Sequence, residues 1–124
     1  MKAYTDLEQS RKLAEILPLE SADMYYFLDP TLAGNIYHLV VQRVDVGIKN
    51  LPQYNEGDIP CWSLSALLDV LPYPQLSKDK LGGEKVGWMV SVYPNDCRYD
   101  SSWHDNAIDA CCKMIIKLKE INLL

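Results

Sequence analysis

The residues of this chain best able to do covalent chemistry are one cysteine and one histidine. Cys61 stands in the sequence Pro-Cys-Trp-Ser at the expected start of a helix, where unpaired amides and the helix dipole lower the pKa of a thiol. His104 is followed by Asp105 and Asn106, either of which could orient an imidazole. These residue types allow a small cysteine hydrolase in which Cys61 is the nucleophile and His104 the base.

The Cys61-Trp62 pair is similar to the nucleophile segment of papain-like proteases, and its spacing to His104 is similar to that of small cell-wall peptidases with the same chemistry. The glycine and second cysteine that precede the papain nucleophile have no counterpart here, and His104 adjoins a helix instead of lying in a strand. The favoured interpretation is therefore that Cys61 and Trp62 pack the start of a helix onto a sheet, with the hydrolase as the alternative.

The remaining patterns predict no metal and no cofactor. The four cysteines contain no C-x-x-C pair. Cys111 and Cys112 are adjacent, and on a helix their side chains point about 100° apart, so they cannot both ligate one tetrahedral ion. The chain also lacks a phosphate-binding glycine loop, a G-x-S-x-G turn and an H-E-x-x-H pair. We expect four free thiols.

Length and charge restrict the class of protein. The 124 residues suit a single domain, residues 1–124, with one core. A formal charge of −5 with scattered basic residues predicts no nucleic-acid partner. No apolar run approaches the roughly 18 residues that cross a bilayer, and the first eight residues are charged where a signal peptide is apolar. We therefore expect a cytoplasmic protein that binds no membrane.

Aromatic usage indicates an interaction surface. The chain has eight tyrosines and three tryptophans but a single phenylalanine, and Tyr and Trp favour partly wet interfaces because they combine apolar area with a polar group. The expected positions at strand starts and ends make Tyr25, Tyr37 and Tyr93 the candidate partner-binding residues. The alternative explanation for these tyrosines is that they only cover the exposed face of a sheet.

A repeated sequence motif predicts two of the helices that must position these residues. Residues 13–18, LAEILP, recur as residues 67–72, LLDVLP, each an apolar helical pattern stopped by proline. The pattern predicts helices over about 5–17, begun by a Thr5–Glu8 capping box, and over about 61–71. A third helix is expected from Asp105 or Asn106 to about Ile121.

Strand patterns fill the intervals between the helices. Residues 24–28 and 36–46 predict a hairpin, and the alternation over 86–93 predicts a strand that pairs with 98–103. Residues 47–60 and 73–85 have no period and are expected to be loops. The resulting fold class is α+β, a two-layer sandwich in the order α-β-β-α-β-β-α. Its mainly antiparallel sheet of about four or five strands carries three helices on one face.

The third helix is the most apolar of the three. Its polar residues form one narrow stripe, so most of its circumference must be covered. We expect it to be central, with Ile115 and Leu118 among the most buried residues and with the two terminal leucines docked on the core. A homodimer that shares part of this surface or of the aromatic face is a further expectation.

Three blocks of the chain, residues 12–25, 60–72 and 105–111, resemble a family of small uncharacterised proteins encoded in phages and mobile elements of anaerobic gut bacteria. The resemblance implies an intracellular accessory protein and transfers no activity and no catalytic residues. The leading hypothesis is a non-enzymatic module that binds a protein of the host or of the mobile element.

Overall fold

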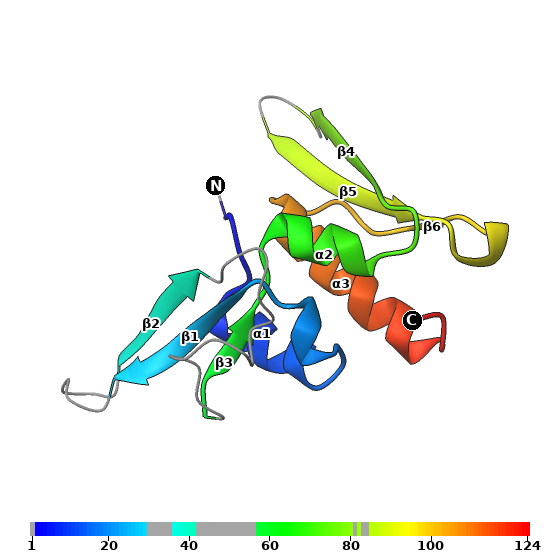
Figure 1. Cartoon of the computed structure of the whole chain (residues 1–124). Helices are drawn as coiled ribbons and strands as arrows, with labels where there is room; N and C mark the ends of the chain where they lie inside the picture. The colour runs from blue at the N-terminus through cyan, green and yellow to red at the C-terminus, as the bar shows by residue number, and fades with distance from the viewer. Residues whose placement is uncertain (1, 30–35, 42–56, 81, 83–84) are drawn as a thin grey trace.

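The computed structural model describes residues 2–29, 36–41, 57–80, 82 and 85–124. Within these ranges the chain forms three α-helices and two three-stranded antiparallel sheets (Figure 1). The expected α+β class is confirmed. The expected single sheet with all three helices on one face is wrong, because the strands divide into a sheet ordered β2-β1-β3 and a sheet ordered β4-β5-β6.

The first sheet is built on the expected hairpin. β1 (Met24–Asp29) pairs with β2 (Ile36–Val41) from Met24↔Val41 to Asp29↔Ile36; residues 42–46 of the expected strand lie outside the described ranges. β3 (Ile59–Cys61) pairs with the other side of β1. The sequence predicts a loop at Ile59 and Pro60 and a helix from Cys61, and both predictions are wrong here. Pro60 is tolerated in β3 because this strand lies at an edge of the described sheet.

The second sheet is centred on β5 (Val86–Val92), the strand with the clearest alternation. β4 (Gln75–Lys80) pairs along nearly all of it, although its sequence was expected to be loop. On the other side β6 (Tyr99–Asp100) is shorter than the expected 98–103, and a bridge between Trp88 and His104 extends the pairing. The end of β4 and the start of β5 reach away from the helices (Figure 1).

Helix α1 (Leu7–Ala14) is shorter at both ends than the expected 5–17, and its N-cap lies one residue after the expected Thr5. Asp6 is the N-cap, and it forms a capping box with Gln9 in which each side chain accepts a hydrogen bond from the other residue's backbone N–H. Thr5 is instead fully buried. Helix α2 (Leu64–Val70) begins after the N-cap Ser63, so Cys61 belongs to β3 and not to a helix start.

Helix α3 (Ala107–Glu120) is central, as its sequence predicts. It packs on β5 and α2 and approaches α1. Asn106 caps its start by accepting a hydrogen bond from the Asp109 amide. Its end is a Schellman motif: Asn122 has a left-handed φ of 59°, and Leu123 N–H donates to the Leu118 carbonyl at 2.8 Å.

One hydrophobic cluster joins the two halves of the chain. It contains Leu13 and Tyr25 from the first half, Trp62 at the crossing, and Val90 and Ile115 from the second. Ile115 and Leu118 have no exposed surface, which confirms the expectation for α3. Leu123 packs against this cluster, whereas Leu124 keeps 36% of its surface exposed. Docking of the terminus is thus confirmed for the first of the two leucines.

Candidate binding groove

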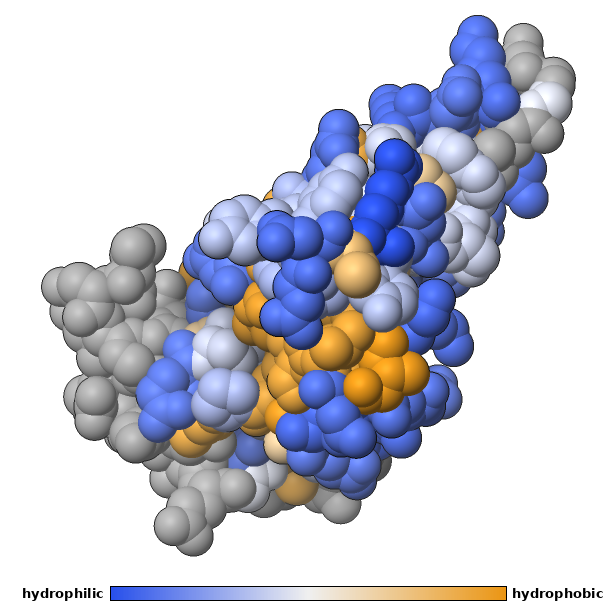
Figure 2. Space-filling view, turned by 90° about the vertical axis from the view of Figure 1, so that its right-hand side faces the viewer, coloured by the Kyte–Doolittle hydropathy of each residue, from blue (hydrophilic) through white to orange (hydrophobic). Residues whose placement is uncertain are grey.

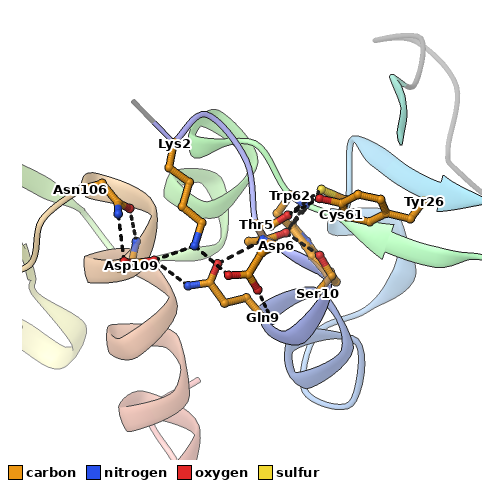
Figure 3. Close-up of polar contacts among 10 residues, drawn as sticks. All are labelled: Lys2, Thr5, Asp6, Gln9, Ser10, Tyr26, Cys61, Trp62, Asn106 and Asp109. Carbon is orange, nitrogen blue, oxygen red and sulfur yellow. Dashed lines mark hydrogen bonds and ion pairs between the residues drawn. The ribbon is translucent and has the colours of Figure 1, made fainter. Parts of the chain in front are cut away.

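Cys61 lies in a closed cluster of hydroxyl groups (Figure 3). Its side chain has no exposed surface. The thiol donates to the Thr5 carbonyl at 3.4 Å and accepts from the Thr5 hydroxyl at 3.5 Å. The same hydroxyl contacts Ser10 Oγ at 2.8 Å and accepts from the Trp62 amide at 3.1 Å, while Tyr26 also donates to the Thr5 carbonyl. Thr5 is therefore the centre of a polar cluster that fastens the N-terminal segment to β3.

This setting does not activate Cys61 as the hydrolase hypothesis needs, because the effect of burial on the thiol outweighs that of its hydrogen bonds. Burial raises the pKa of the Cys61 thiol, whereas a nucleophile needs a lowered one. His104 is held elsewhere, by its backbone bridge to Trp88 in the second sheet, and its Nε2 lies 3.1 Å from Ser102 Oγ. The structure therefore does not bring the proposed nucleophile and base into hydrogen-bond contact.

The three candidate tyrosines occupy three separate places. Tyr25 is fully buried, so its ring does not present a surface to a partner. The ring of Tyr37, on β2, lies 5.7 Å below the guanidinium of Arg11. Tyr93 follows β5 and donates from its hydroxyl to Gln75 Oε1 at 3.4 Å. The structure does not gather them into one patch.

An open groove of about 750 Å³ runs between α1 and α3. Its floor contains Leu13, Cys112 and Ile116. Its rims carry charged and polar side chains: Lys2, Asp6, Glu8, Gln9, Arg11, Lys12, Glu15, His104, Asp109 and Lys113. Sequence reasoning missed this site, because its walls come from residues about a hundred positions apart.

A polar bridge closes one end of the groove (Figure 3). Asp109 on α3 accepts from Lys2 Nζ at 2.9 Å and from Gln9 Nε2 at 2.7 Å. Its second oxygen accepts from Asn106 Nδ2 at 2.9 Å, and Lys2 also pairs with Asp6 at 3.0 Å. The N-terminal segment, α1 and α3 are thereby held in register.

The bridge stabilises the charged forms of its members. Burial alone disfavours a carboxylate at Asp109, but the hydrogen bonds from Lys2, Gln9 and Asn106 outweigh it and lower the pKa of Asp109. Burial likewise disfavours the ammonium of Lys2, yet its contacts with Asp109 and Asp6 raise its pKa. At neutral pH the carboxylate of Asp109 is therefore already neutralised from within the chain.

Apolar side chains also gather on the face where α3 ends (Figure 2). At this end of the chain Ile121 and Leu124 keep 43% and 36% of their surface exposed. The homodimer expected from the sequence stays a prediction, which light scattering at high protein concentration would test.

Within the described ranges, no group of three or more His, Cys, Asp or Glu side chains is placed to hold a metal ion. No helix in the described part of the chain has the length and apolar character needed to cross a membrane. Comparison with protein families, with curated proteins and with solved structures finds no match, so no activity transfers from a relative.

Proposed function

We propose that this protein is a non-enzymatic protein-interaction module and that the α1–α3 groove is its binding surface. The groove itself is the observation that supports this proposal. It is a concave site of about 750 Å³ whose rims are charged and polar, a composition suited to holding a segment of another protein through complementary charges. The cysteine that could have supported catalysis is closed off beneath α1.

The proposed biological role rests on the sequence blocks 12–25, 60–72 and 105–111. Their resemblance to small proteins of phages and mobile elements supports an accessory protein that acts inside the cell. Its partner is then a protein of the host or of the element itself. The formal charge of −5 agrees with a protein partner better than with a nucleic acid.

Affinity capture from the source organism, followed by reconstitution from purified components, tests the proposal. We expect one reproducible partner that binds the purified protein in isothermal titration calorimetry. A charge-reversal double variant on the rims, Lys12→Glu with Lys113→Glu, should weaken this binding. Its control is Lys80→Glu with Lys119→Glu, which makes the same change of charge at exposed positions that do not line the groove.

Two results together would reject the proposal: no partner that can be reconstituted, and turnover of a substrate by the purified protein. The cysteine hydrolase would then return as the explanation, and Cys61→Ser should abolish the turnover. Binding that both double variants weaken equally would leave an interaction module whose surface is not the groove.

A further inference from the structure

The two walls of the groove have the same helical spacing. On α1 the exposed lining residues recur at i, i+3, i+4 and i+7: Glu8, Arg11, Lys12 and Glu15. On α3 the lining residues recur in the same pattern: Asp109, Cys112, Lys113 and Ile116. Residues with this spacing lie along one face of a helix. The groove is therefore a channel about two helical turns long, roughly 10 Å, between two helix faces.

Its walls restrict the backbone conformation of an occupant. Both walls are α-helices whose backbone groups are hydrogen-bonded within the helix, so the groove offers no strand edge to an extended peptide. A helix satisfies its own backbone N–H and C=O groups, so it can lie against such walls without new backbone hydrogen bonds. The wall geometry therefore favours a helical occupant over an extended one.

The charges that face this occupant are basic in the middle. Lys12 and Lys113 form no ion pair with any residue that the structure describes, and Arg11 lies over the ring of Tyr37. The acidic residues near them are of two kinds. Asp6 and Asp109 are already paired with Lys2, whereas Glu8 and Glu15 lie at the two ends of the α1 stripe. An occupant with acidic side chains at its centre would complement this pattern.

A second copy of α1 is a poor match for the same stripe. Its charges read minus, plus, plus, minus from Glu8 to Glu15. Antiparallel packing of two copies about a point between Arg11 and Lys12 would place Glu8 against Glu15 of the other copy, and the basic residues against each other. Like charges facing one another oppose a dimer with this arrangement of the two α1 helices. We therefore take a segment of a different protein as the occupant.

The floor contributes little to the contact with a partner. Leu13 has no exposed surface and Cys112 only 2%, so Ile116 is the one partly exposed apolar residue there. Apolar burial against the occupant is accordingly small, and the charges at the rims must supply most of the selectivity. Binding should therefore weaken steeply as salt is added.

We propose that the α1–α3 groove binds a short helix of a partner protein, with acidic side chains at its centre that pair with Lys12 and Lys113. This inference rests on the proposed function, since it specifies the occupant of the same groove. It adds the conformation, the charge pattern and the salt dependence of the bound segment.

Site-specific photocross-linking in the source organism identifies the segment. A photoreactive amino acid is placed at Lys12, at Lys113, or at the control position Lys119, which is exposed on α3 but does not line the groove. The segment cross-linked from both groove positions is sequenced by mass spectrometry and synthesised as a peptide. We expect a sequence with central Asp or Glu, whose circular dichroism becomes more helical when the protein is added.

Affinity measurements then test the charge pairing. The Lys12→Glu, Lys113→Glu double variant should raise the Kd for this peptide at least tenfold, and exchange of the peptide's acidic residues for lysine should restore binding to that variant. The Lys80→Glu, Lys119→Glu control should change the Kd less than threefold. Raising the salt from 50 to 500 mM should weaken binding of the original peptide at least fivefold.

Different results would overturn the helix proposal and the proposed function. Cross-links to a partner that arise only from Lys119, a peptide that stays non-helical when bound, or a Kd unchanged by the double variant would overturn the helix proposal while leaving an interaction module. Absence of any partner that can be cross-linked or reconstituted would overturn both.

Discussion

The central place of α3 can be tested by replacing Ile115. This side chain has no exposed surface and lies in a stripe of equally buried residues on the helix: Ile108, Cys111, Ile115 and Leu118. Ile115→Ala removes three carbon atoms from the cluster shared by both halves of the chain. Truncations of this kind cost about 2–5 kcal/mol. A mid-range loss of about 3 kcal/mol corresponds to a fall in Tm of roughly 10–15 °C for a chain of this length.

Ile115→Asp should be more severe, because an unpaired carboxylate in this cluster adds a desolvation cost to the lost packing. The sum approaches the whole free energy of unfolding of a small domain, about 5–15 kcal/mol. We expect no cooperative transition in urea or thermal melts followed by circular dichroism at pH 7. The control is Ile121→Asp, made just after the same helix at a side chain that is 43% exposed, which should keep its transition. If Ile115→Asp melts as the native protein does, α3 is peripheral and the described core is wrong.

Two further predictions follow from the thiols and from the polar bridge. Cys97 is the exposed cysteine, whereas burial raises the pKa of Cys61 and raises the pKa of Cys111 to about 12. Iodoacetamide at pH 7.5 should therefore label Cys97 first, as followed by mass spectrometry. Labelling of native Cys61 ahead of Cys97 would contradict the buried cluster. The pKa of Asp109 is lower in the folded protein than its ordinary value of 3.8, so its contribution to stability is present above that value and is lost as the pH falls through the folded pKa. In urea melts, the free energy of unfolding of Asp109→Asn should be lower than that of the native protein at pH 7, and this difference should shrink toward pH 2. A difference that is constant with pH would mean that the charge of Asp109 does not hold the bridge.

Local signals in the sequence located the elements whose residues interact with near neighbours. Pro72 lies just beyond α2 and Asn106 caps α3, because caps and breakers act within a turn of the chain. Helix α1 already ends at Ala14, before the stop expected at Pro18. The β1–β2 hairpin and β5 were likewise evident from their composition and alternation. The apolar arc of α3 correctly indicated its burial, since a helix that is apolar over most of its circumference must be covered.

The same local signals could also mislead by a residue or two. A capping box anchored on Thr5 and one anchored on Asp6 are both chemically reasonable. Thr5 is instead drawn into the cluster around Cys61 and Trp62, and its neighbour takes the cap. Long-range hydrogen bonds thus decided between the two local alternatives.

Tertiary structure alone decided the division into two sheets and the location of the groove. β4 reads as QLSKDK, with no apolar alternation, and becomes a strand because it is an edge that β5 pairs along nearly its whole length. Cys61 becomes part of a strand because β1 is available to pair with it. The groove depends on Gln9 and Lys2 meeting Asp109 across the chain. Sequence specifies such side chains, but their meeting is set by how the elements pack, and packing energies come from contacts between residues far apart in the chain.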